Sequence, residues 1–185
     1  LAGIHNALEV QDRKLRDMKI VINGAGSAGI ATAELLLKAG AENIVVLNSS
    51  GILNEDNPRM NHVQKELAEK TNPEKRSGGL EKAIEGANIF IGLSKGGVFP
   101  AELIKLMSGD PVILAMALPD PEILPEEAIA AGAAIVATGG PGFQNAMPNT
   151  LSSPGIMRGL LDVRATVLNH NMLLEAARAL ADVVD

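Results

Sequence analysis

Six residues near the start of the chain have the types and spacing of a phosphate-binding turn. The segment Gly24-Ala25-Gly26-Ser27-Ala28-Gly29 fits the pattern G-x-G-x-x-G and lies between an apolar run and a helical pattern. In such a turn the first glycine permits the tight bend, the second lets a pyrophosphate approach the backbone, and the third lets the helix pack closely on the strand. Amide groups at the start of the helix then face the phosphate charge. We therefore expect this segment to bind a dinucleotide; a glycine turn with a purely structural role is the alternative.

The residue expected to contact the adenosine ribose is Asn48, which follows the second apolar run. In dinucleotide-binding turns an Asp or Glu about 20 residues beyond the glycines accepts hydrogen bonds from the ribose. Asn48 can bond a ribose hydroxyl but has no charge to repel a 2′-phosphate, and Ser49 and Ser50 could donate to one. The nearest arginine, Arg59, lies in a long polar stretch. The choice between NAD and NADP therefore stays open, with NAD favoured.

Apolar runs alternate with helical patterns along the chain, and each connection is long enough for a crossover between parallel strands. This order predicts an α/β fold, a doubly wound parallel sheet with both faces covered. We expect its central strand at 20–22 and the cofactor crevice at the carboxyl ends of the strands. The predicted strands are 19–22, 43–47, 89–93, 111–116 and 134–137. One helix is predicted from the glycine turn to residue 39, and further helices are predicted at 62–70, 80–84, 100–107, 125–131, 153–161 and 166–184.

Composition excludes several classes of function. The chain has 185 residues, a formal net charge of −6, three Phe, and neither Trp, Tyr nor Cys. Nucleic-acid binding is disfavoured without a basic run or aromatic residues to stack on bases, and thiol chemistry is excluded. The longest apolar runs, such as 112–118, are far shorter than the roughly 20 residues of a membrane helix, and the N-terminus lacks the order of a signal peptide. We expect a soluble, cytoplasmic protein with neither nucleic-acid nor membrane partners.

Five blocks together resemble the malic enzymes (decarboxylating malate dehydrogenases), specifically their NAD(P)-binding domain. The resemblance implies a Rossmann-like domain that binds NAD or NADP, with the pyrophosphate on Gly24 to Gly29 and the ribose at Asn48. It also implies that Ser94 ends a strand at the nicotinamide side and that Asn149 faces malate. The blocks that carry it are 1–8, 21–30, 71–78, 87–94 and 154–166.

The same resemblance implies an oxidoreductase that oxidises (S)-malate by hydride transfer and decarboxylates the product to pyruvate and CO₂. The family's general acid and base, a Tyr and a Lys, and its metal-binding Glu and Asp residues match nothing here. We therefore predict no catalytic residue and no metal ligand in 1–185, and expect Mg²⁺ or Mn²⁺ to be bound mainly by an upstream domain. The chain is then a fragment of a longer enzyme, inactive alone, and homo-oligomeric, a dimer, as the whole protein.

Three departures from the family pattern affect the substrate side. Leu118 occupies the place of a substrate-contacting asparagine, and its side chain cannot supply that hydrogen bond. Gly140 lies in a segment that reads Gly-Arg-Ser-Asp-Phe in the family, and Pro148 replaces the first of two paired asparagines. Leu118 and Asn149 are the predicted substrate positions. The departures keep open an alternative, a non-catalytic or designed Rossmann module.

The remaining candidate residues have plainer interpretations. The histidines lack any ligand spacing, which indicates surface or capping roles. Lys95 is expected to be solvated. Three glutamates are interpreted as an acidic first helical turn stabilised by the helix dipole. The apolar face of the last helix is interpreted as core, with a dimer interface as the alternative. The residues concerned are His5, His62 and His170; Glu122, Glu126 and Glu127; and Leu168, Met172, Leu173, Ala176, Leu180 and Val183.

Overall fold

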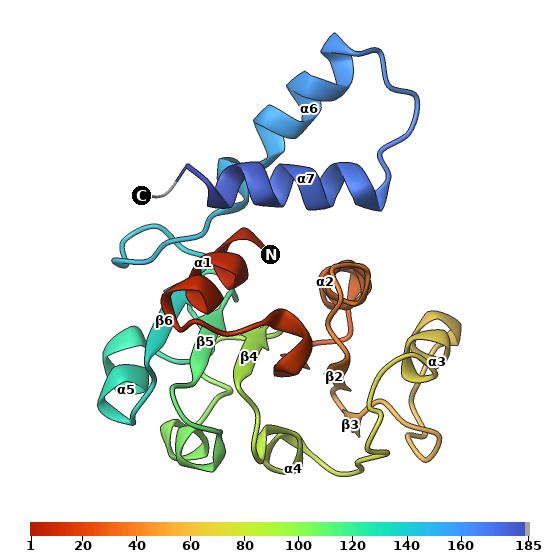
Figure 1. Ribbon diagram of the computed structural model, residues 1–185. Helices are drawn as coiled ribbons and strands as arrows, with labels where there is room; N and C mark the ends of the chain where they lie inside the picture. The colour runs from red at the N-terminus through yellow and green to blue at the C-terminus, as the bar shows by residue number, and fades with distance from the viewer. Residues whose placement is uncertain (184–185) are drawn as a thin grey trace.

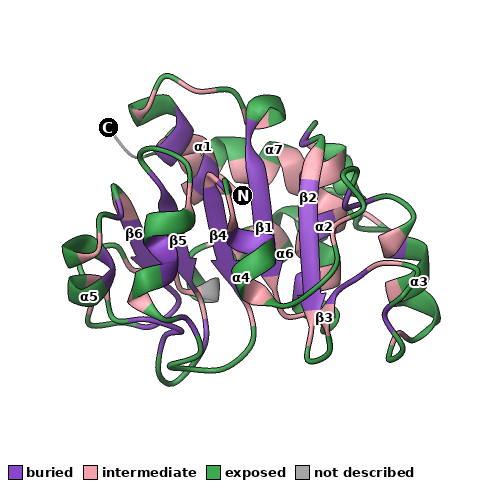
Figure 2. Ribbon diagram, turned by 90° about the horizontal axis from the view of Figure 1, so that it is seen from below, coloured by how far each residue is buried: buried purple, intermediate pink, exposed green. Residues whose placement is uncertain are grey.

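One mixed sheet forms the centre of the protein. A computed structural model describes residues 1–183, apart from the side chain of Asn149. Within this range the sheet has six strands in the order β3-β2-β1-β4-β5-β6 (Figures 1 and 2). The five longer strands are parallel, as predicted, and β1 lies between β2 and β4. Their bounds are β1 Lys19–Asn23, β2 Asn43–Asn48, β4 Ile89–Gly92, β5 Val112–Ala115 and β6 Ile135–Thr138.

A short edge strand was not predicted. Strand β3 (Gly51–Ile52) turns back and pairs antiparallel with the end of β2, where Leu47 faces Ile52. Two residues are too few to produce a hydrophobic period, so the sequence shows only a break after Asn48. Strand β3 therefore forms the edge of the sheet next to the expected ribose site.

The strands are buried on both faces, which confirms the doubly wound fold. Ile20 and Ile22 pack in one apolar cluster with α1 (Ala2–Val10) and α2 (Ser27–Lys38). Val21 points the other way into a second cluster. That cluster is covered by α4 (Leu80–Ile84), the 3₁₀ helix η2 (Ala101–Leu106) and α5 (Pro125–Ala130). Figure 2 shows the strands buried along their length between more exposed helices. Full burial of each such aliphatic side chain contributes about 1.5–3 kcal/mol.

The segment predicted as a helix at 100–107 is instead η2. Its amides bond three residues back, from Leu103 to the Pro100 carbonyl and from Met107 to the Ile104 carbonyl. Bonding of this kind is common in short helical segments, and the apolar pattern of 100–107 does not distinguish it from an α-helix. The helix predicted at 62–70 is α3 (His62–Ala68), begun by a capping box between Asn61 and Gln64.

The last two helices lie beyond α1 and α2, on that side of the sheet (Figure 1). They follow η3 (Asn149–Leu151) and are α6 (Ser153–Asp162) and α7 (His170–Ala181). Helix α7 begins later than predicted because the Asn169 side chain accepts a hydrogen bond from the Met172 amide and caps it. The predicted end at Val184 lies outside the described residues.

The apolar face of α7 was wrongly predicted to be core. No residue of α6 or α7 is buried. Leu168, Met172, Ala176, Leu180 and Val183 line an open groove between these two helices. Helix α7 does contact α1 and α2, but α6 extends away from the sheet, so nothing in the described structure closes the groove. Helical periodicity shows that a face is apolar, but it does not show what covers that face.

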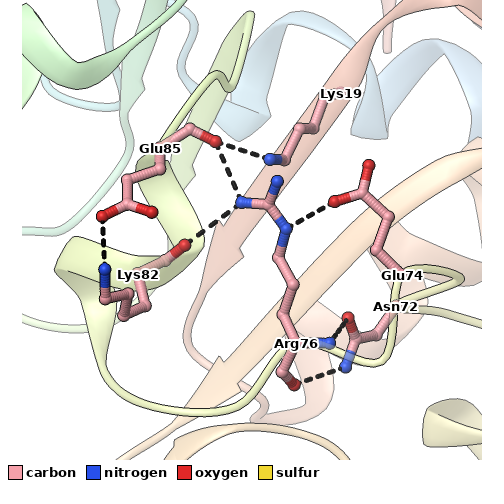
Figure 3. Close-up of polar contacts among 6 residues, drawn as sticks. All are labelled: Lys19, Asn72, Glu74, Arg76, Lys82 and Glu85. Carbon is pink, nitrogen blue, oxygen red and sulfur yellow. Dashed lines mark hydrogen bonds and ion pairs between the residues drawn. The ribbon is translucent and has the colours of Figure 1, made fainter.

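A polar network fastens the loop before α4 to the amino-terminal edge of the sheet (Figure 3). The Arg76 guanidinium donates to the Glu74 carboxylate at 2.6 Å and to the carbonyl oxygens of Lys82 at 3.2 Å and Glu85 at 2.9 Å. The Lys19 ammonium, on the first residue of β1, donates to the same Glu85 carbonyl. The hydrogen bond from Arg76 holds the pKa of Glu74 below its ordinary value. Parallel strands place their carboxyl ends at the opposite edge, so this network lies away from the glycine turn.

Candidate functional site

The glycine turn joins the end of β1 to the start of α2. Gly26 is the N-cap of α2, and no side chain caps the helix. Gly26, Ser27 and Ala28 are exposed. The amides of the first helical turn therefore lack partners inside the helix and face outward with the positive end of the helix dipole. This arrangement suits a phosphate group.

The three glycines of the turn differ in the space that surrounds them. Gly24 has a φ of +128°, and a Cβ there would overlap the carbonyl oxygen of Leu93. A Cβ on Gly29 would overlap the carbonyl oxygen of Gly24, so this glycine lets helix and turn approach closely. A Cβ on Gly26 would meet nothing within 4 Å. Gly24 and Gly29 are thus required by the protein's own packing, whereas the space at Gly26 is free for a ligand.

Asn48 lies at the carboxyl end of β2, but its side chain is engaged within the protein. Its Oδ1 accepts from the Ser50 amide at 2.8 Å and from the Asn57 side chain at 3.1 Å. Its Nδ2 donates to the Arg59 carbonyl at 2.8 Å and is 3.5 Å from Oε1 of Gln64. These contacts use both the donor and the acceptor atom of the amide. Asn48 therefore shapes the loop after β2.

Gln64 connects this loop to the glycine turn. Its Nε2 donates to the Ala25 carbonyl at 2.8 Å, and its Oε1 accepts from the Asn61 amide at 3.3 Å. Sequence reasoning missed this contact, because the capping pattern of α3 shows where the helix begins but not what its side chains reach. The positions expected for pyrophosphate and ribose are therefore held side by side.

Ser94 follows β4 and lies next to the glycine turn. Its hydroxyl oxygen accepts from the Asn23 side chain at 3.2 Å, across the ends of β1 and β4. Lys95, as expected, is exposed. The structure thus brings together the glycine turn, Asn48 and Ser94, which are far apart in the sequence, at one edge of the sheet.

The residues that depart from the family pattern lie along the same edge. Leu118 follows β5 and is 63% exposed. A Cβ on Gly140, which follows β6, would lie 3.4 Å from Cδ2 of Leu118, so these two departures are neighbours. Pro148 directly precedes η3 and is half-buried. Asn149 falls within η3, but its side chain lies outside the described part, so its role stays a prediction.

Glu122 was wrongly predicted to belong to the acidic first turn of a helix. Helix α5 begins at Pro125, and Glu122 lies before it, fully buried. Its carboxylate accepts from the amides of Ser94 and Ala117. Glu126 and Glu127 do occupy the first turn of α5. The available signal was the apolar setting of Glu122, between Pro121 and Ile123, which is unusual for a solvated carboxylate.

The histidines do not converge on a site. His62 pairs with Glu66 at 3.4 Å on the surface of α3. Burial lowers the pKa of His5 below its ordinary value. In the part of the chain that the structure describes, no three His, Asp or Glu residues are grouped so that they could hold a metal ion. Nor is any described helix both long enough and apolar enough to cross a membrane.

The whole chain, residues 1–185, matches the family model described as malic enzyme, NAD binding domain. The chain belongs to this family. The bifunctional malic/malolactic enzyme of Bacillus subtilis is 44% identical over 185 residues, which are 100% of this chain and 45% of that protein. The NADP-dependent malic enzyme of Rhizobium meliloti is 41% identical over 186 residues, 98% of this chain and 24% of that protein.

A solved structure supports the same conclusion for the fold. The NAD-dependent malic enzyme of Thermotoga maritima superposes with a TM-score of 0.92 at 46% identity, over 96% of this chain and 48% of that one. The malic enzyme NAD-binding domain therefore has the Rossmann-like fold expected from the sequence. The chain spans less than half the length of these three proteins.

Proposed function

We propose that this malic enzyme NAD-binding domain holds NAD or NADP for the oxidative decarboxylation of (S)-malate to pyruvate and CO₂. The observation that carries the proposal is the uncapped start of α2, open at Gly26, with Asn48 and Ser94 on either side. The space at Gly26 and the outward amides of α2 fit a pyrophosphate. When bound, the cofactor supplies the hydride acceptor.

Each part of the edge has a task in this proposal. The amides of Ser27 and Ala28 bind the pyrophosphate, and the loop held by Asn48 receives the adenosine ribose. The exposed hydroxyls of Ser49 and Ser50 are available to a 2′-phosphate, so the choice between NAD and NADP depends on this loop. Ser94 lies at the nicotinamide side.

The substrate side is incomplete within these 185 residues. Leu118 lies where the family has an asparagine, and its exposed apolar side chain cannot hydrogen-bond a carboxylate. The oxidation needs a base for the C2 hydroxyl proton, an acid for the enolate carbon and a divalent metal on the C2 oxygen. The proposal assigns these groups, with Mg²⁺ or Mn²⁺, to a second domain of a longer protein, and Asn149 to malate.

A chimaera tests the catalytic part of the proposal. These 185 residues would replace the matching segment of the Bacillus subtilis enzyme, and NADH or NADPH formation would be followed with malate and Mn²⁺. We expect metal-dependent turnover by the chimaera and none by the 185 residues alone. Turnover by the isolated chain would contradict the assignment of the base, the acid and the metal to a second domain. An inactive chimaera that still binds NAD⁺ would favour the alternative, a non-catalytic Rossmann module, and Leu118→Asn in that chimaera is then the informative repair.

Two further parts of the proposal concern the whole protein. We expect a homodimer, which light scattering of the full-length enzyme would test. We also expect the protein to reside in the cytoplasm, which cell fractionation would test.

A further inference from the structure

A buried carboxylate connects the two loops that follow β4 and β5. Glu122 is 0% exposed. One carboxylate oxygen accepts from the Ser94 amide at 3.1 Å, and the other accepts from the Ala117 amide at 3.0 Å. No ion pair in the described part of the chain includes Glu122, so hydrogen bonds from these two amides compensate its charge. Burying a carboxylate is costly unless it is hydrogen-bonded, so its presence here calls for a specific reason.

The backbone around Glu122 is bonded to the same loop. The Phe99 amide donates to the Glu122 carbonyl at 3.1 Å, and the Gly97 amide donates to the Pro121 carbonyl at 3.0 Å. Strand β4 leaves room for the carboxylate at Gly92, where a Cβ would lie 2.5 and 2.6 Å from its two oxygens. Both the loop and the strand are therefore built around this one side chain.

The carboxylate acts on residues at the nicotinamide side of the proposed cofactor site. Its first partner, Ser94, also accepts the hydrogen bond from Asn23 beside the glycine turn. Its second partner, Ala117, directly precedes Leu118 at the substrate side. An apolar side chain at this position would leave two amides without partners, and an unpaired buried donor is destabilising.

From this arrangement we infer that Glu122 is a positioning residue for the nicotinamide half of the cofactor. It fixes the separation of Ser94 and Ala117 and so sets the shape of the edge that receives the nicotinamide. The adenosine half is held elsewhere, at the glycine turn and the loop of Asn48. The inference rests on the proposed function, because it takes NAD or NADP to lie along this edge with the nicotinamide at Ser94.

The decisive variant is Glu122→Gln, which keeps the size of the side chain but offers only one acceptor oxygen to the two amides. Glu126→Gln is the matched control, because Glu126 is an exposed carboxylate in the first turn of α5. Calorimetry would measure the affinity of each chain for NAD⁺ and for ADP-ribose, which lacks only the nicotinamide. We expect Glu122→Gln to weaken NAD⁺ about tenfold, the effect of one lost hydrogen bond, with ADP-ribose unchanged. The control should change neither affinity.

A measurement on the unmodified chain supports the test if Glu122→Gln does not fold. Amide exchange followed by NMR should show Ser94 and Ala117 more protected than Lys95 and Leu118 without ligand. NAD⁺ should slow exchange at Ser94 and Ala117 further, and ADP-ribose should not. Equal weakening of NAD⁺ and ADP-ribose by Glu122→Gln, no weakening of either, or unprotected Ser94 and Ala117 amides would overturn the inference. An unmodified chain that binds neither ligand would instead overturn the proposed function, and the inference with it.

Discussion

Replacing Gly26 with valine tests whether the open space at the glycine turn is the cofactor site. The backbone at Gly26 has φ −80° and ψ −173°, an extended conformation that valine adopts readily. A Cβ there meets nothing within 4 Å, so the branched side chain fits the free protein. Gly29→Ala is the companion variant. Its Cβ would lie 2.9 Å from the carbonyl carbon of Gly24 and overlap the attached oxygen.

Gly26→Val should mainly weaken cofactor binding, whereas Gly29→Ala should mainly lower the stability of the protein. Valine is a poorer N-cap than glycine, so Gly26→Val should lower the free energy of unfolding by at most about 1 kcal/mol, or about 2–4 °C in Tm. It should weaken NAD⁺ by roughly 100-fold or more, because two charge-assisted bonds from amides to phosphate contribute about 3 kcal/mol together. Gly29→Ala forces backbone atoms apart and should destabilise the protein by about 3 kcal/mol or more.

Thermal unfolding and calorimetry with NAD⁺ would measure both effects on the same samples. Gly40→Ala is not a suitable control, because Gly40 has a φ of +97° that alanine rarely adopts. Gly109→Ala is suitable, since Gly109 has no positive φ and a Cβ there meets nothing within 4 Å. Full NAD⁺ affinity in Gly26→Val would refute the placement of the pyrophosphate. A Gly29→Ala chain as stable as Gly26→Val would refute the packing argument.

Three other substitutions test separate parts of the structure. Asn48→Asp should raise the preference for NAD over NADP, since a carboxylate repels a 2′-phosphate; an unchanged ratio of the two affinities would mean that the ribose is bound elsewhere. Arg76→Met should lower the free energy of unfolding by about 1–3 kcal/mol in urea, because the side chain makes three hydrogen bonds, whereas the exposed Lys70→Met should not. Neither Arg76→Met nor Lys70→Met should alter the affinity for NAD⁺. Burial lowers the pKa of His5, so the unfolded chain takes up a proton more readily as the pH falls below about 6.5. The unmodified chain should therefore lose more stability than His5→Gln between pH 7.5 and pH 5, and equal losses would contradict the assigned cause.

The sequence by itself determined the five parallel strands and the glycine turn. Strands β1, β4 and β5 are short, nearly continuous apolar runs, and such runs mark strands buried on both faces. The three glycines at fixed spacing after β1 predicted the turn correctly, because tight bends and close approaches are local backbone requirements. The same local information predicted α4 with its observed bounds, Leu80–Ile84.

Only the tertiary structure decided which of the remaining residues matter and how. Glu122 reaches Ser94 across 28 positions of sequence, and Gln64 reaches Ala25 across 39, and no local pattern encodes such contacts. A row of apolar residues looks the same whether or not another element covers it, so the sequence placed the α7 face in the core and the structure left it in an open groove. Asn48 was placed correctly at the end of its strand, but only its neighbours in space show that its amide is already occupied. Periodicity and turn chemistry act within a few residues, whereas burial and hydrogen-bond partners depend on how distant segments meet.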